Sequence, residues 1–553
     1  MATTTAVISD QRTKKNRILS PEDVTDLIAA GKAIVIYKDN VLNLTPWLKF
    51  HPGGDKAVYH MVGRDATDEM EVYHSEEVIS KFTKWKIGQI DYQWENMLPP
   101  IQGGIYKLKD LNGQSLEQNR KSPKLAGELD GPVTPIVPQG VRYVDKNDKD
   151  KYFPICERDV VVDPKQLMEL YENGLARSEL LELPLLDYAT QNDIKNQYHK
   201  LHAKIIRAGL YKCDYGNYAR ELIKIGSLFL YSFSFLSIKQ YVLSAVFIAM
   251  AWHQMTFIAH DAGHVSLSHN YQVDNIFGMI IADWFGGLSL GWWKRNHNVH
   301  HLVTNDPVHD PDIQHLPFFA VTTRLFDNVY STYYDKFLWF DAFAKKVIPY
   351  QNYLYYPILT FGRFNLYRLS WTHLLLGQGP RKGPAAWFRH FELAGLSFFF
   401  YWFFYVLVGG IDGGWNKFKY VMISHMSTML VHVQITLSHF AMSTSDLGVS
   451  ESFPSRQLRT SMDVDCPEWL DFLHGGLQFQ AIHHLFPRLP RHNLRKAQSY
   501  VIDFCKEVGL PYSIYGFGKG NEIVIGKLGE IGKQCSIMLD CTKKMREDQI
   551  YDI

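Results

Sequence analysis

Three histidine-rich clusters are the part of this sequence most clearly able to do chemistry. They read His260-Asp-Ala-Gly-His264, His297-Asn-Val-His300-His301 and Gln480-Ala-Ile-His483-His484. Within each cluster, residues three or four positions apart share one face of a helix, so each cluster can direct several side chains at one point. Seven histidines and a glutamine beside apolar segments would be costly without a partner, and they therefore indicate metal binding.

The spacing of these clusters does not by itself select the metal, because imidazole suits iron, copper, zinc and nickel. His439, at the end of a later apolar stretch, is a candidate for an additional ligand. We interpret the remaining histidines near the apolar segments as structural: His253, His269, His309, His425, His432 and His474.

A further histidine pair lies near the N-terminus, where His51-Pro-Gly-Gly54 precedes His74 by 23 residues. Two histidines on facing elements can ligate a haem iron from both sides, and the Pro-Gly-Gly turn lets the backbone approach a flat cofactor. Ligation by two imidazoles leaves no open position for dioxygen, which favours electron transfer. An attached electron donor favours iron in the other histidine site, because zinc is redox-inert.

Composition narrows the class of protein. The 553 residues predict two to four folding units. A formal net charge of +1 gives no sign of a nucleic-acid partner. The six cysteines are scattered without a disulfide framework, and the first twenty residues lack the apolar core of a secretory signal. Both observations predict that the N-terminus faces the cytosol.

We expect five segments along the chain. Ser20, Pro21 and Gly31 delimit a first helix, and a hairpin follows it. The segments are a haem-binding domain at 15–95, a Pro- and Gly-rich linker at 96–165, a cytosolic helical segment at 166–221, a membrane domain at 222–505 and a cytosolic C-terminal tail at 506–553.

Four apolar stretches approach the roughly 20 residues that a helix needs to cross a bilayer. We expect crossings at about 222–238, 241–259, 391–409 and 418–438. Two further stretches, Ile276–Trp293 and Tyr353–Leu376, are interrupted by charges and predict interfacial or re-entrant segments. Two helical hairpins would leave the three clusters on one side of the membrane, as a single metal site requires.

The N-terminal motif resembles cytochrome b5 domains, whose HPGG signature, DAT segment and second histidine all have matches between Ser20 and Ile90. This resemblance implies that His51 and His74 are the axial ligands of haem b. The fold class that we expect is an α+β haem domain of this type, fused to an all-α desaturase domain with four transmembrane helices.

The succession HDAGH, HNVHH and QFQAIHH resembles the front-end desaturases, in which cytochrome b5 is fused to a membrane desaturase. Gln480 in place of the first histidine of the third cluster is that family's mark. Many relatives read QIEHH, whereas Ala481 and Ile482 stand here. The resemblance implies two non-haem irons, with these ligands: His260, His264, His297, His300, His301, His439, Gln480, His483 and His484.

The resemblance also implies the reaction, in which dioxygen and two electrons convert two adjacent methylenes of a lipid into a double bond. The electrons would come from NADH through a separate cytochrome b5 reductase, because the chain has no GxGxxG fingerprint after a strand. We expect a multi-pass protein of the endoplasmic reticulum membrane, with both termini and the histidine clusters in the cytosol.

The overall pattern is most similar to fungal sphingolipid Δ8 desaturases, which act on the long-chain base of ceramides. Three alternatives stay open. The chain could be a Δ6 or Δ5 polyunsaturated acyl desaturase, a sphingolipid or fatty acid hydroxylase, or a haem sensor on a membrane anchor. The first two would differ in substrate or product, and the third would not need the histidine clusters.

Overall fold

The computed structural model describes residues 15–104 and 163–547, together with the backbone of four short strands between them. These strands form two antiparallel pairs, β4 (Leu108–Lys109) with β5 (Ser115–Leu116) and β6 (Val141–Tyr143) with β7 (Pro154–Cys156). Most of the linker expected at 96–165 therefore lies outside the described residues.

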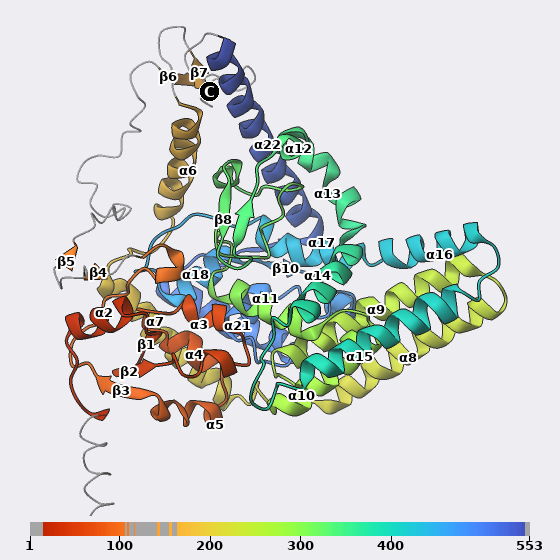
Figure 1. The fold of residues 1–553 in the computed structure, drawn as a ribbon, viewed down its shortest axis with the longest axis horizontal. Helices are drawn as coiled ribbons and strands as arrows, with labels where there is room; N and C mark the ends of the chain where they lie inside the picture. Colours follow the sequence, from red (N-terminus) through yellow and green to blue (C-terminus); the bar gives the residue numbers. More distant parts are fainter. Residues whose placement is uncertain are drawn as a thin grey trace, which may run out of the picture.

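The first domain packs helices around a three-stranded antiparallel sheet (Figure 1). The expected first helix is confirmed, since Ser20 and Asp23 cap it reciprocally and Gly31 follows it with a φ of 77°. The expected hairpin is confirmed as β1 paired with β2. The elements are α2 (Pro21–Ala29), β1 (Ile34–Tyr37), β2 (Asn40–Asn43), η1 (Leu48–Phe50), α3 (Asp55–Tyr59), α4 (Thr67–Tyr73), α5 (Glu76–Ile79), η2 (Phe82–Lys84), β3 (Lys86–Gln89) and η3 (Pro100–Gln102).

Two amphipathic helices follow the strands of the linker region, α6 (Pro164–Leu180) and α7 (Tyr188–Arg207). Buried residues of α7 recur at helical spacing, at Ile194, Tyr198, Leu201 and Ile205. They pack against the C-terminal helices of the chain, and the cytosolic helical segment predicted from the sequence is therefore part of the folded body.

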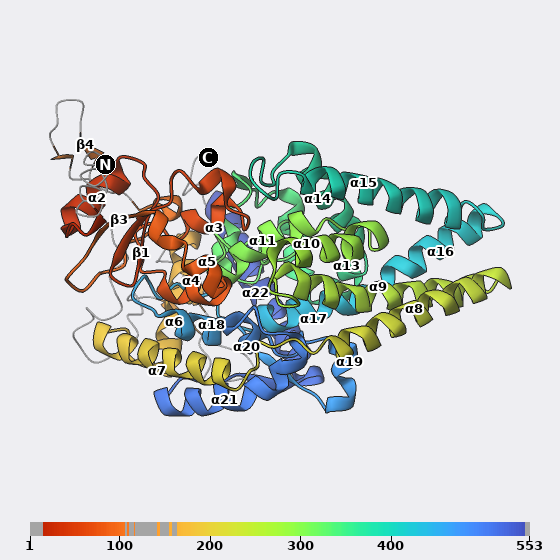
Figure 2. The same ribbon diagram turned by 90° about the horizontal axis from the view of Figure 1, so that it is seen from below.

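Four helices project together from the body as an arm (Figures 1 and 2). They are α8 (Tyr215–Ser237), α9 (Tyr241–Gly263), α15 (Phe388–Phe400) with its π-helical continuation η8 (Tyr401–Val408), and α16 (Gly414–Met426). At the far end, Lys239 in the α8–α9 turn and Asp412 in the η8–α16 turn form an ion pair of 2.8 Å. Both turns therefore lie at the same end of the arm, as two parallel hairpins require.

Among the described residues, two helices are long and apolar enough to cross a membrane, α9 and the combined helix Phe388–Val408. The expected count of four crossings is thus not confirmed. Helix α8 carries Arg220, Glu221 and Lys224 in its first half. The stretch expected at 418–438 is divided at Ser427 and Thr428 into α16 and α17 (Met429–Phe440).

The apolar stretch around Ile276–Trp293 folds back on itself. Helix α10 (Tyr271–Met279) continues as the π-helical turn η5 (Ile280–Phe285), and α11 (Leu290–Leu302) leaves at an angle of 116°. The bend is the geometry of a broken or re-entrant segment, as the interrupting charge indicated. The second such stretch forms two shorter helices, α13 (Gln351–Leu359) and α14 (Gly362–Leu376).

The rest of the chain completes the body, and it differs from two of our predictions. Residues 506–553 were expected to be a tail, but α22 (Phe517–Glu547) packs on the body through Val524, Leu528, Ile531 and Cys535. The domain is also not purely helical, because β8 pairs with β9 and β10 with β11. The other elements are η6 (Thr323–Phe326), β8 (Val329–Ser331), β9 (Lys336–Leu338), α12 (Ala342–Val347), η7 (Ile348–Tyr350), α18 (Phe453–Thr460), β10 (Asp463–Asp465), η9 (Glu468–Leu470), α19 (Asp471–His474), α20 (Gln480–Leu485), η10 (Arg491–Asn493), α21 (Leu494–Val508) and β11 (Ile514–Gly516).

Candidate metal centre and haem site

The three histidine clusters of the sequence converge in the body, at the base of the arm. His260 lies near the end of α9 and His264 caps it, while α11 carries the second cluster and α20 the third. Gly263 is required between the first two histidines, because a Cβ there would collide with the ring of Trp293. That ring stacks on His297 with a centroid distance of 4.5 Å and so helps to fix the site.

Two groups consist of histidines alone, each with ligand atoms within 4.8 Å of one another, and a third group combines His297 and His300 with Asp312. The first group combines all three sequence clusters, in His260, His264, His297 and His483. The second group consists of His300, His439 and His484, so the structure brings His439 of α17 to the site. Gln480 is buried at the start of α20, one helical turn before His483.

His301 belongs to neither group but contacts both. Its Nε2 lies 2.9 Å from Nε2 of His297, and its ring stacks on His484 with a centroid distance of 4.1 Å. The two groups are therefore adjacent, with His301 between them. The histidines interpreted as structural lie outside both groups; His253, for example, contacts the carbonyl oxygen of Leu473 through Nε2 at 2.9 Å.

Several of these rings are oriented by polar groups that the sequence reasoning missed. Nδ1 of His300 lies 2.8 Å from Oδ2 of Asp310, and Nδ1 of His484 lies 2.9 Å from Oε1 of Gln457. Gln457 also donates to the carbonyl oxygen of His301. Asp312 lies 3.6 Å from Nδ1 of His297. Such partners fix the tautomer and direction of a metal-binding imidazole. The acidic run Asp306, Asp310, Asp312 just after the second cluster was the available signal.

The donor set fits a bound metal. Buried ring nitrogens without a hydrogen-bond partner, within the described part of the chain, include Nε2 of His260, His264, His483 and His484. Burial lowers the pKa values of His483 and His484 well below the ordinary value for histidine, so these imidazoles are neutral. Neutral imidazoles whose lone pairs converge in a buried space are the ligands that a divalent metal needs.

The departure from QIEHH in the third cluster has a structural explanation. Ala481 and Ile482 are fully buried in an apolar core with Leu485 and Phe486. A carboxylate from another segment serves this helix instead, since Oδ1 of Asp463 accepts a hydrogen bond of 2.9 Å from the backbone N–H of Ala481. The side chain at 482 therefore packs the helix and does not orient a ligand.

In the first domain, His51 and His74 face each other with ring centroids 6.2 Å apart. Nδ1 of His51 donates to the carbonyl oxygen of Gly54 at 2.7 Å, and Nδ1 of His74 donates to that of Met70 at 2.9 Å. Burial lowers the pKa of His74 to about 4, which keeps its ring neutral. Two metal–nitrogen bonds of about 2 Å each fit this gap, so the pair suits an iron held from both sides.

The first domain is docked on the body of the structure at the end of α4. Arg488, four residues after the third cluster, donates from Nη1 to the carbonyl oxygen of His74 at 2.7 Å. Asp65 accepts from Lys195 and Asp68 contacts His199, each at 2.5 Å. Lys56 of α3 pairs with Asp335 at 2.6 Å. The two histidine sites are therefore held close together.

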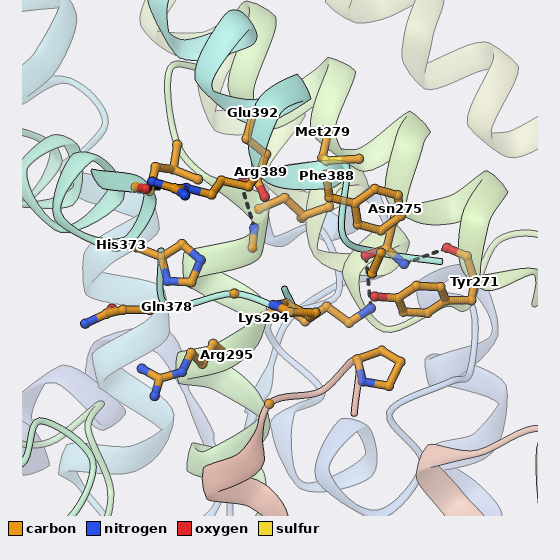
Figure 3. A pocket seen from close by; sticks show the side chains of 18 residues that line it. Tyr271, Asn275, Met279, Lys294, Arg295, His373, Gln378, Phe388, Arg389 and Glu392 are labelled. Carbon is orange, nitrogen blue, oxygen red and sulfur yellow. Dashed lines mark hydrogen bonds between the residues drawn. The ribbon is translucent and has the colours of Figure 1, made fainter. Parts of the chain in front are cut away.

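A pocket opens between the haem-domain loop and the helices α10, α11, α14 and α15 (Figure 3). It encloses about 590 Å³ of space free of atoms, part of it open to solvent. Lys294 is buried in its wall, donates to Asn275 at 3.1 Å and lies over the ring of Tyr271. Glu392 lines the same pocket and accepts from the N–H of Gly291. The pocket thus offers two buried polar groups, of which Lys294 lies one helical turn before His297 on α11.

Comparison with known proteins identifies two families in this chain. Residues 238–516 match the model of the family described as "Fatty acid desaturase", and residues 20–91 match "Cytochrome b5-like Heme/Steroid binding domain". The chain therefore belongs to the fatty acid desaturase family, with a cytochrome b5 domain fused at its N-terminal side. It is a membrane oxidoreductase of lipid metabolism that carries a haem-binding domain.

Relatives along the full length narrow the comparison. A protein of Candida albicans named "Delta 8-(E)-sphingolipid desaturase" is 63% identical over 97% of this chain and 99% of its own length. A protein of the same name from Emericella nidulans is 50% identical over 97% of this chain and 98% of its own length. An "Acyl-lipid (9-3)-desaturase" of Borago officinalis is 32% identical over 66% of this chain and 81% of its own.

Proposed function

We propose that this protein is a Δ8 sphingolipid desaturase that introduces a trans double bond into the long-chain base of ceramides. The observation that carries the chemistry is the pair of buried histidine groups whose unpaired ring nitrogens converge beside a docked haem domain. The name and 63% identity of the Candida albicans protein support the substrate and the geometry of the product.

The metal ligands in this proposal follow the two groups. His260, His264, His297 and His483 would hold one iron, and His300, His439 and His484 the other. His301 lies between the two, and Gln480 is a further candidate ligand one turn from His483. Bound iron would supply the chemistry in which dioxygen, two electrons and two protons convert –CH2–CH2– into –CH=CH– with release of two water molecules.

The residues of the chain would hold that chemistry in place. Asp310 and Gln457 would keep the rings of His300 and His484 directed at the metal. His51 and His74 would hold haem b, which delivers one electron at a time. NADH-cytochrome b5 reductase would reduce the haem, as the absence of a dinucleotide fingerprint in the sequence indicates.

The pocket beside Lys294 would receive the polar head of the lipid. Lys294 and Glu392 offer a buried donor and a buried acceptor, which suits the hydroxyl and amide groups of a ceramide. The same helix, α11, carries Lys294 and His297, so a fixed head would place the alkyl chain in one register relative to the metal. Register decides which pair of methylenes reacts.

We propose that the protein resides in the endoplasmic reticulum membrane with four crossing helices and with both histidine sites on the cytosolic side. The arm supports this topology, because its two turns meet at the end away from the haem domain (Figure 2). A cytosolic haem domain would be accessible to a cytosolic reductase.

Expression in a yeast that lacks Δ8-unsaturated sphingolipids tests the reaction. Mass spectrometry of long-chain bases and fatty acids would follow the product, with His483→Ala as the control. We expect trans-Δ8 bases that disappear in the control. Saturated bases together with a newly unsaturated polyunsaturated acid would instead favour an acyl desaturase, which the Borago officinalis relative makes the second candidate. A hydroxylated base would contradict desaturation.

A further inference from the structure

We propose that Tyr73 is the bridge over which electrons pass from the haem ligand His74 to His301 and so to both histidine groups. This inference rests on the proposed function, in which the haem supplies the electrons for desaturation.

The contact between the two domains is direct at this residue. Tyr73 is the last residue of α4 and His74 follows it, so the haem ligand and the tyrosine are covalent neighbours. The ring of Tyr73 meets that of His301 edge to face, with a centroid distance of 5.9 Å and an interplanar angle of 84°. Because His301 contacts His297 and His484, one aromatic contact connects the haem ligand to both groups.

Other contacts hold this end of α4 in place. Arg488 donates a hydrogen bond of 2.7 Å to the carbonyl oxygen of His74, the residue that follows Tyr73. Val72 is buried in the apolar core that α7, α20 and α21 form in the desaturase body. The position of Tyr73 between the two sites is therefore set by packing and by a charge-assisted hydrogen bond.

The surroundings of Tyr73 indicate how it would act. Its hydroxyl is buried and has no hydrogen-bond partner among the residues that the structure describes. Oxidation of a tyrosine releases the phenolic proton, and no hydrogen bond among the described residues connects this hydroxyl to a base. The aromatic ring would therefore serve as a bridge without becoming an oxidised intermediate, and phenylalanine should replace it.

The electron balance is simple. In each transfer, haem iron goes from ferrous to ferric and the metal held by the clusters gains one electron. Two transfers supply two electrons. The two hydrogens removed from the lipid supply the other two electrons and two protons, and solvent supplies two further protons, so one dioxygen becomes two water molecules.

A second contact offers the competing route. Asn298 of α11 donates from Nδ2 to the carbonyl oxygen of Gly53, at 3.3 Å, beside the other haem ligand. This link is a long hydrogen bond to a backbone group, whereas Tyr73 provides a ring in contact with a ring. The structure therefore favours the route through Tyr73. A variant of Asn298 tests the competing route.

Stopped-flow absorbance of the haem in the full-length, iron-loaded protein tests the bridge. The haem is first reduced by NADH and reductase without oxygen, and its reoxidation is then followed after mixing with oxygen and ceramide. The variants are Tyr73→Leu, Tyr73→Phe and Asn298→Leu, with Tyr59→Leu as a control on an exposed tyrosine of the same domain. The haem midpoint potential, its spectrum and the rate of its reduction by the reductase are measured for each.

We expect Tyr73→Leu to slow reoxidation about tenfold, equivalent to about 1.4 kcal/mol of barrier. Tyr73→Phe and Tyr59→Leu should match the wild type, and potentials and reduction rates should not change. Wild-type reoxidation in Tyr73→Leu, slow reoxidation in Asn298→Leu alone, or equal slowing in Tyr73→Phe would each overturn the proposal. Reoxidation that is equally fast in His483→Ala would show separately that the haem does not feed the clusters, which contradicts the proposed function itself.

Discussion

Nδ1 of His300 and Oδ2 of Asp310 lie 2.8 Å apart in a part of the body from which solvent is excluded. The same carboxylate oxygen accepts the backbone N–H of Asn305 at 2.7 Å, so Asp310 is itself held in position. His300 belongs to the second histidine group, and the direction of its ring therefore depends on a residue ten positions further along the chain.

Asp310→Asn should weaken metal binding by about 10- to 100-fold while leaving the haem unchanged, because outer partners of metal-binding histidines typically contribute that much. Iron bound per chain, measured by plasma mass spectrometry, and the haem spectrum would report the two sites separately. Asp327→Asn, which changes an exposed carboxylate, is the matched control. Full iron occupancy in Asp310→Asn would show that the ring of His300 needs no such support.

The third cluster should not tolerate the more common glutamate. Ile482→Glu would place a carboxylate in a core where the native side chain is fully buried among apolar residues. A buried charge without a partner costs several kcal/mol, so we expect a large loss of thermal stability. Ile482→Val should cost only about 0.5 to 1.5 kcal/mol. Equal unfolding temperatures for the two variants would contradict the packing role of this position.

Docking of the haem domain should weaken as the pH rises above the ordinary pKa of histidine. The hydrogen bond to Asp68 raises the pKa of His199 above its ordinary value. The docked state therefore binds the proton of His199 more tightly than the undocked state does. The protonated side chain stabilises docking fully at a pH below the ordinary pKa of histidine, and this stabilisation is lost as the pH rises through the raised pKa of His199. Hydrogen exchange of α4 against pH measures docking. Replacing His199 with glutamine should remove the dependence, and an unchanged profile would contradict this origin.

Lys294→Met should impair binding of the lipid more than the chemical step. The substitution keeps the stem of the side chain and removes the buried amino group that donates to Asn275 in the pocket wall. We expect a higher KM for ceramide with kcat nearly unchanged, the pattern for a lost binding contact. Arg381→Met, outside this pocket lining, is the control. A fall in kcat alone would place Lys294 in the chemistry instead.

The C-terminal helix should contribute to the stability of the body. Leu528 is buried on the face of α22 that packs against α13 and α17, and Leu528→Ala should cost about 2 to 5 kcal/mol. Thermal unfolding followed by circular dichroism would measure the loss. Lys533→Ala, on the exposed side, should have little effect, and similar losses in both variants would contradict the packing of this helix.

The sequence alone predicted those site residues that lie close together along the chain. His260 and His264, or Gln480 with His483 or His484, could be recognised because a helix brings positions three or four apart to one face. Asp310 and Gln457 could not be assigned in this way, since only the folded chain places them beside His300 and His484. The break at Ser427 and Thr428 was hidden within a continuous apolar run, and α22 was missed because its buried positions are separated by polar residues.

The contact between Tyr73 and His301 was equally invisible to sequence reasoning. The two residues are far apart in the chain and belong to different domains, and no local pattern marks either as an interface residue. Only the docking of α4 on the body, through Arg488 and Val72, brings them together.

The ratio of iron to haem in the purified full-length protein tests the central claim most directly. Plasma mass spectrometry gives total iron, and the pyridine haemochrome assay gives haem. The account predicts three irons per haem, one in the haem and two in the histidine groups, falling toward one when His264 and His484 are replaced by alanine. A ratio of one in the active wild-type protein, or zinc in the histidine groups, would contradict it.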